Sequence, residues 1–253
     1  MKLKIKGLLL FVLISSCTSK KDILYMQDAE SLNGKKLSYS NSTIQPNDIL
    51  KITVESAVPE AALLYNKNFS QAVQNQNIQL LQLDGYLVSI KSTIIFPVLG
   101  EISTANKSTE QLAIDIKNLL KSGDQLNDAS VNVRLINAKV TILGEVNQPG
   151  TYNFTEQNIT VLQALGYAND LTINGKRDDV LITREVDGVR KITHIDLTSV
   201  EFMNSEFYFI KPNDVIVVNP NNPQVKRAGF IGDVGTVLTI ASLVLSITIL
   251  LSR

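Results

Sequence analysis

The stretch of sequence that decides the fold of this chain is Leu-Gly-Glu-Val-Asn-Gln-Pro-Gly-Thr-Tyr, residues 143–152. Its first half continues a β-prone run that begins at Val140, and its second half leads into a strand that contains Tyr152 and Phe154. The Asn-Gln-Pro-Gly segment between them predicts a turn, because proline and glycine set the backbone angles that a turn requires. We therefore expect two strands joined by a short connection.

The sequence after these strands completes an α+β unit. Residues 160–167 have a helical pattern with apolar side chains able to face a sheet. The Asp-Gly pair at 187–188 predicts a hairpin between strands at 180–184 and 189–195. A strand at 215–218 closes the unit. Two strands, a crossing helix and further strands suit a β-grasp domain, which we place at residues 138–220.

A second, smaller α+β unit is expected upstream, at residues 44–137. Strands are predicted at 49–54, 86–90, 93–98 and 131–135. Ser108 and Gln111 begin a helix with a capping-box pattern, and Gly123 is placed to end it. Its predicted apolar face consists of Leu112, Ile116, Leu119 and Leu120. The Pro-Asn-Asp sequence at 46–48 recurs at 212–214, and the Asn- and Gln-rich residues 66–77 suggest a surface loop.

The N-terminus has the three parts of a signal peptide, which we place at residues 1–16. Lys2, Lys4 and Lys6 precede an uncharged run, and small residues lead into Cys17, the only cysteine of the chain. We expect lipid attachment at Cys17; the alternative is an ordinary secretory signal followed by a chance cysteine. A single cysteine excludes an intrachain disulfide and a thiolate metal cluster. Polar residues 17–43 lack clear periodicity and are expected to form a tether.

The C-terminus carries a long apolar run, and residues 230–251 are predicted to form a transmembrane helix. Its small residues follow steps of three and four, which places them on one stripe for helix packing or for lining a pore. This stripe consists of Gly232, Gly235, Thr239, Ser242 and Ser246. In the alternative, a monomeric anchor, the serine and threonine hydroxyls bond only to their own backbone. A buried core helix is less favoured.

Composition and residue types argue against nucleic-acid binding and catalysis. The chain has 24 basic and 24 acidic residues, and loss of residues 1–16 removes three lysines, so the net charge becomes −3. No basic stripe suggests a nucleic-acid partner. His194, the only histidine, lies in a half-buried strand pattern, and the acids at 178, 179 and 185 suit a solvated hairpin edge better than a carboxylate pair. We expect no catalytic residues, metal or cofactor.

The motifs resemble a known family. Residues 143–152 and 160–165 resemble the start of a soluble-ligand-binding β-grasp (SLBB) domain, whereas residues 44–50, 95–100 and the helix from Ser108 resemble the polysaccharide biosynthesis/export domain. The Leu-Ile-Ser-Ser-Cys sequence at 13–17 resembles a bacterial lipobox. Both domains occur in this order in outer-membrane lipoproteins that export capsular and extracellular polysaccharide.

The resemblance implies a non-enzymatic subunit of a ring-shaped export channel. It would be lipid-anchored at the outer membrane, with most of the chain in the periplasm. The implied partners are further copies of the chain, the polysaccharide, an inner-membrane polysaccharide co-polymerase and membrane lipid. Two departures from the family pattern, at 91–93 and 168–170, weaken the transfer of single residues, and one β-grasp unit instead of two implies a shorter body. The alternatives are a pore-free scaffold lipoprotein that binds glycan or protein and, ranked far lower, a glycan-processing enzyme.

Overall fold

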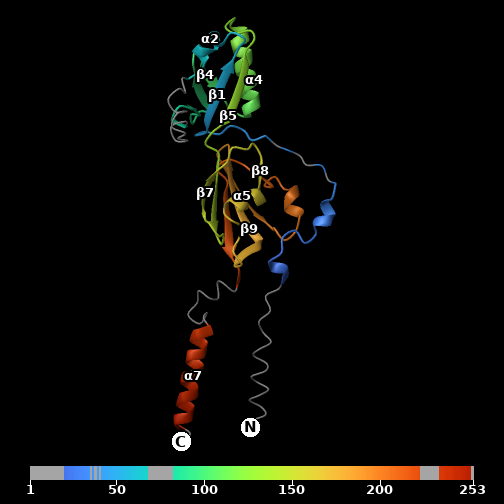
Figure 1. Ribbon diagram of the computed structural model, residues 1–253, viewed down its shortest axis with the longest axis vertical. Helices are drawn as coiled ribbons and strands as arrows, with labels where there is room; N and C mark the ends of the chain where they lie inside the picture. The colour runs from blue at the N-terminus through green and yellow to red at the C-terminus, as the bar shows by residue number, and fades with distance from the viewer. Residues whose placement is uncertain are drawn as a thin grey trace.

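The computed structural model describes residues 20–34, 36, 39, 41–67, 82–222 and 234–251. Two α+β units lie one above the other in Figure 1, and the helix α7 is separate from them. We call residues 41–67 and 82–136 the N-terminal unit, residues 138–222 the C-terminal unit, and residues 20–34 the strap. Each unit has its own cluster of buried apolar side chains.

The N-terminal unit is a three-stranded antiparallel sheet, a short hairpin and a helix. The sheet order is β2-β1-β5, and β3 pairs with β4. Its elements are β1 (Ile49–Glu55), α2 (Pro59–Ala62), η3 (Leu63–Tyr65), β2 (Tyr86–Leu87), β3 (Thr93–Phe96), β4 (Gly100–Ser103), α4 (Thr109–Ser122) and β5 (Ser130–Leu135). The predicted loop at 66–77 falls mostly outside the described residues.

Helix α4 forms largely as its sequence predicts. The Ser108 hydroxyl accepts a hydrogen bond from the Gln111 backbone N–H at 3.2 Å, which satisfies a free donor of the first turn. The Gln111 side chain turns instead to Asp115, so the expected capping box is only half formed. Leu119, which we placed on the apolar face, is 43% exposed. The contacts of α4 with β5 therefore rest on a narrower stripe than predicted.

The predicted strand at 93–98 is shorter in the structure and is followed by a strand that the sequence did not indicate. β3 ends at Phe96, because Pro97 has no N–H for a ladder and Val98 has a positive φ of 65°. The chain then turns at Gly100 into β4. Proline and a residue in the left-handed region thus convert one expected strand into a hairpin.

The C-terminal unit is a five-stranded mixed sheet covered by a short helix. The sheet order is β10-β9-β12-β6-β7, in which only β12 and β6 pair in parallel. Its elements are β6 (Lys139–Gly144), β7 (Gly150–Asn153), β8 (Ile159–Thr160), α5 (Val161–Tyr167), β9 (Gly175–Val186), β10 (Val189–Ile195), η5 (Glu201–Asn204), β11 (Phe209–Ile210) and β12 (Val215–Pro220). β9 is much longer than predicted.

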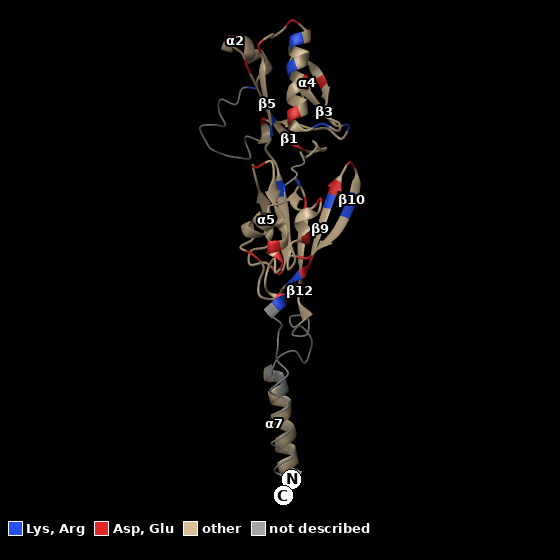
Figure 2. Cartoon of the chain, turned by 90° about the vertical axis from the view of Figure 1, so that its right-hand side faces the viewer, with Lys and Arg blue, Asp and Glu red and all other residues tan. Residues whose placement is uncertain are grey.

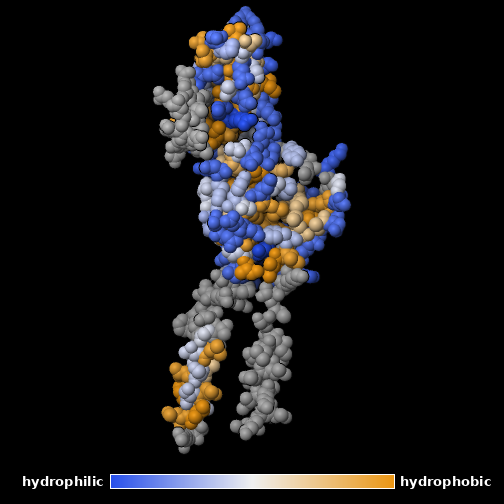
Figure 3. Space-filling model, viewed as in Figure 1, coloured by the Kyte–Doolittle hydropathy of each residue, from blue (hydrophilic) through white to orange (hydrophobic). Residues whose placement is uncertain are grey.

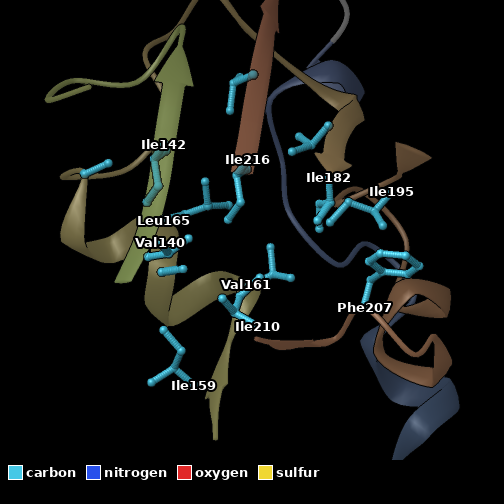
Figure 4. Close-up of a cluster of buried hydrophobic side chains, with 14 of the residues drawn as sticks. Val140, Ile142, Ile159, Val161, Leu165, Ile182, Ile195, Phe207, Ile210 and Ile216 are labelled. Carbon is cyan, nitrogen blue, oxygen red and sulfur yellow. The ribbon is translucent and has the colours of Figure 1, made fainter. Parts of the chain in front are cut away.

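The core of the C-terminal unit forms where α5 meets the sheet. Figure 4 shows Val161 and Leu165 of α5 beside Val140, Ile142 and Ile216 of the sheet. A full capping box starts the helix: the Thr160 hydroxyl accepts from the Gln163 N–H, and the Gln163 side-chain oxygen accepts from the Thr160 N–H. Burial of these branched side chains is the main force that holds the helix on the sheet.

One buried ion pair joins β9 to the chain that leads into β12. Arg184 and Asp214 are both nearly inaccessible, and the guanidinium donates to the carboxylate at 2.7 and 2.9 Å. The same guanidinium donates to the backbone carbonyls of Glu206 and Phe209, and it lies 4.5 Å from the centre of the Phe207 ring. Arg184 thereby satisfies two backbone carbonyls of the segment before β12.

Loss of one partner of this pair should be strongly destabilising. We expect Asp214→Asn to lower the free energy of unfolding by about 3–5 kcal/mol, because it leaves a buried guanidinium without its counter-charge. Urea unfolding measures the change. The matched control is Glu185→Gln, which breaks the exposed pair with Arg190 and should change stability by less than about 0.5 kcal/mol. Equal effects of the two substitutions would contradict this assignment.

The strap lies on the C-terminal unit, although the sequence indicated only a tether there. The Met26 and Gln27 N–H groups donate to the carbonyls of residues 197 and 198 at 3.0 and 2.8 Å. The Asp28 carboxylate accepts from the Ser199 hydroxyl and the Val200 N–H. The strap appears in blue beside the C-terminal unit in Figure 1. Residues more than 140 positions apart in the sequence therefore form one packed structure.

The C-terminal helix α7 (Val234–Leu251) is formed, but the prediction of a transmembrane helix is wrong. Within the described part of the chain, no helix combines the length and the apolar character that crossing a membrane requires. At 1.5 Å per residue, its 18 residues reach about 27 Å, less than the roughly 30 Å of a hydrocarbon core. Glycine, serine and threonine also interrupt the apolar run.

Candidate functional site

The candidate site is a pocket of about 250 Å³ where the N-terminal and C-terminal units meet. Residues 41–50, 109–110 and 133–135 of the N-terminal unit contribute to it, together with Ala138, the 154–157 loop and Pro212 of the C-terminal unit. Its lining residues are Asn41, Ser42, Thr43, Ile44, Asp48, Leu50, Thr109, Glu110, Val133, Arg134, Leu135, Ala138, Phe154, Thr155, Glu156, Gln157 and Pro212.

The pocket has an apolar interior and a polar rim. Ile44, Leu50, Val133 and Phe154 are buried. The charged rim side chains Glu110, Arg134 and Glu156 belong to exposed residues, as do several of the rim residues with hydroxyl or amide groups. An apolar interior with a few polar groups of fixed position is typical of small-molecule sites.

Asp48 is the exception in the buried part of the lining, because it is a carboxylate only 3% exposed. It lies in the turn that opens β1, where Oδ2 accepts from the Gln45 N–H at 2.8 Å and Asn47 has a φ of +71°. The second Pro-Asn-Asp sequence forms the same turn: Asp214 accepts from the Lys211 N–H at 2.8 Å, and Asn213 has a φ of +68°. The sequence repeat is therefore a structural repeat.

The two aspartates differ in their counter-charge. Asp214 is neutralised by Arg184, whereas Oδ1 of Asp48 accepts no hydrogen bond from the described residues. This oxygen is not fully enclosed by other atoms, and because Asp48 lines the pocket, the oxygen is accessible from there. Burial raises the pKa of Asp48 to about 6, and the single bond from Gln45 only partly opposes this.

A reciprocal contact fixes the units next to the pocket. The Gln45 side chain donates to the Asp187 carboxylate at 3.3 Å, and the Asp187 N–H donates to the Gln45 side-chain oxygen at 3.0 Å. Asp187 is the tip of the β9–β10 hairpin, at a positive φ of 53°. In Figure 2 this hairpin carries many of the charged residues of the C-terminal unit. The long hairpin thus reaches the turn that holds Asp48.

The ionisable groups of this pocket are mainly carboxylates. Its titratable side chains are three carboxylates and one guanidinium, without a histidine or cysteine. In the described part of the chain, no three metal-ligating side chains gather. A buried carboxylate with an open oxygen can accept hydrogen bonds or hold a cation.

The residues singled out from the sequence lie elsewhere. Cys17 and Gly232 fall outside the described residues. Gly235, Thr239, Ser242 and Ser246 are on α7, which shows both pale and strongly hydrophobic residues in Figure 3. Their hydroxyls donate within the helix, for example from Thr239 to the Gly235 carbonyl and from Ser246 to the Ser242 carbonyl. Hydroxyls bonded to the backbone of their own helix are the arrangement that we gave as the alternative to a packing or pore-lining stripe.

His194 is a surface histidine of β10. Its side chain is 60% exposed, and Nδ1 contacts Asp179, which also accepts from Lys176 at 2.8 Å. Asp179 therefore belongs to an exposed charge cluster on the sheet. This arrangement agrees with the solvated hairpin edge that we expected.

Sequence reasoning missed the pocket and its carboxylate. The available signal was the repeat of Pro-Asn-Asp, because one copy has a buried arginine partner and the other does not. The alternation of β9 also placed Arg184 on the same face as Val180 and Ile182. A charged residue in a core-facing position requires a partner.

The comparisons with known proteins agree with this architecture. The structure is a small α+β unit followed by a mixed sheet with a crossing helix, which makes it a two-domain protein. The model of the polysaccharide biosynthesis/export protein family matches residues 37–136, and the SLBB domain model matches residues 138–218. The chain belongs to the polysaccharide export family with an SLBB domain, which confirms the resemblance seen in the sequence.

The pKa of Asp48 predicts a specific pH dependence. Between about pH 4 and pH 6 the carboxyl is protonated in the folded chain and ionised in the unfolded chain, so stability falls as the pH rises. Asp48→Asn removes this titration and keeps an acceptor for the Gln45 N–H. The variant should match the wild type near pH 4 and exceed it by about 2–3 kcal/mol at pH 7. Urea unfolding at both pH values measures the difference, and parallel pH profiles would refute it.

Proposed function

We propose that this chain is a non-enzymatic subunit of an oligomeric assembly that exports polysaccharide through the outer membrane. The observation that carries the proposal is the tandem of the two family domains, which together cover most of the chain. An isolated SLBB match would support only a binding module. The export domain in front of it favours transport.

The ionisable groups support a role without catalysis. Arg184 and Asp214 are used in a buried structural pair, and His194 and Asp179 form an exposed one. The remaining buried carboxylate, Asp48, lies in a pocket without a nucleophile–base pair. These side chains stabilise the fold or are placed for binding.

The proposed assembly contains further copies of this chain, the polysaccharide and, at the inner membrane, a polysaccharide co-polymerase. A passage for a polymer requires several subunits around an opening, and closed rings arise from head-to-tail contacts. Exposed apolar side chains on the N-terminal unit, including Leu64, Ile90 and Ile95, offer surface for such contacts.

Oligomerisation and secretion together test this function. We expect the protein to purify in mild detergent as a ring larger than a dimer, because the polymer needs an enclosed path. We also expect that deletion of its gene stops the release of polysaccharide. Light scattering coupled to chromatography measures the first, and assay of surface and medium polysaccharide measures the second. A protein that stays monomeric at high concentration, with secretion unchanged by the deletion, would instead support the pore-free scaffold.

Membrane attachment is proposed to depend on lipid at Cys17. Cys17 precedes the strap by three residues, and a chain of that length spans at most about 11 Å. Several acyl chains on one residue supply stable anchorage, since each buried methylene contributes about 0.8 kcal/mol.

Cys17→Ala should therefore release the protein from the membrane. We expect most of it in the soluble periplasmic fraction, whereas the matched variant Ser19→Ala should stay with the outer membrane. Cell fractionation and immunoblotting measure the distribution. Retention of the alanine variant in the membrane at wild-type level would show that lipid at Cys17 is not the anchor.

A further inference from the structure

We infer that the pocket between the two units binds an amino sugar, whose ammonium group lies against Oδ1 of Asp48. The inference deepens the proposed function and rests on it only for the source of the sugar, a residue of the exported polymer. The binding itself depends on the pocket alone. Three features of the pocket lead to this ligand.

The first feature is the missing counter-charge of Asp48. The same Pro-Asn-Asp turn occurs twice, and in the C-terminal unit its aspartate is held by a guanidinium at 2.7 Å. Asp48 has the same backbone bond and comparable burial but no cationic partner among the described residues. Arg134 also lines the pocket, yet it forms no ion pair with Asp48. A buried carboxylate without a counter-charge is energetically costly. A cation bound beside Asp48 would supply the counter-charge that Arg184 supplies to Asp214.

The second feature is the charge of the rim. Glu110 and Glu156 stand at the opening together with Arg134, so the lining has an excess of negative charge. The two glutamates come from different units. Their carboxylates attract a cation and oppose an anion, which favours an ammonium group over the carboxylate of an acidic sugar.

The third feature is the combination of size and rim chemistry. A volume of about 250 Å³ is smaller than typical drug-sized sites, which start near roughly 300 Å³, and it suits a single small ring. The hydroxyls of Ser42, Thr109 and Thr155 and the amide of Gln157 can exchange hydrogen bonds with sugar hydroxyls. The buried Phe154 adds an apolar surface for a ring face. A simple alkylamine would leave the rim groups unmatched.

Isothermal titration of the detergent-solubilised full chain at pH 7 tests this site. The probes are glucosamine, N-acetylglucosamine, glucose and butylamine. We expect saturable binding of glucosamine, at least tenfold weaker binding of N-acetylglucosamine and glucose, which lack the charge, and weaker binding of butylamine, which lacks the hydroxyls.

Variants locate the binding. Asp48→Asn should weaken glucosamine binding at least tenfold. Glu156→Gln removes a charge from the exposed rim and leaves the buried turn of Asp48 unchanged, so it should weaken binding several-fold. The control Glu101→Gln changes an exposed carboxylate of β4 outside this pocket and should have no effect. Denaturation curves of each variant verify its fold.

Two outcomes would overturn the inference. One is the absence of saturable glucosamine binding to the wild-type chain, and the other is equal binding by wild type and Asp48→Asn. Either result can coexist with a ring oligomer and normal secretion, so failure of the site is distinguishable from failure of the proposed function. Conversely, specific glucosamine binding by a chain whose deletion leaves secretion unchanged would support the site and reject export.

Discussion

The buried pair of Arg184 and Asp214 is the constraint on which the C-terminal unit depends. Apolar burial alone does not specify where the segment before β12 must lie, because that segment contributes few regular backbone bonds. The guanidinium reaches across from β9 and satisfies the carboxylate and two carbonyls at once. A buried guanidinium is energetically costly unless its N–H groups are hydrogen-bonded. The pair therefore favours the one arrangement of this region in which Asp214 and the two carbonyls accept from Arg184. β12, the central strand of the sheet, is placed as a result.

The same turn without its arginine gives the molecule its pocket. In the N-terminal unit, Asp48 keeps the turn geometry but faces a cavity instead of a guanidinium. One sequence motif therefore serves two purposes, stability in one unit and an open acceptor in the other. The Gln45 and Asp187 contact couples the two turns, since Arg184 lies in β9 of the hairpin whose tip, Asp187, contacts the turn that holds Asp48.

Local sequence patterns predicted the helices and strands well, but they predicted the contacts between distant residues poorly. The cap of α4, the Asp-Gly hairpin and the strand after residue 214 follow from short-range rules and are present in the structure. β4 and the full length of β9 were missed because these strands are defined by the strands they pair with and not by an alternation of apolar and polar residues in the sequence. The pocket was missed for a related reason: its walls come from separate segments that lie between residues 41 and 212. The C-terminal run was predicted to span a membrane from its apolar content, but no helix in the described part of the chain is long and apolar enough to do so.

The strap gives the folding of this chain a definite order. Residues 20–34 are synthesised early, but the carbonyls and donors that hold Met26, Gln27 and Asp28 belong to residues 197–200. No docking site exists until residues 197–200 have been synthesised, and closing so long a loop is slow. The strap can therefore dock only after the last strands of the C-terminal unit have formed.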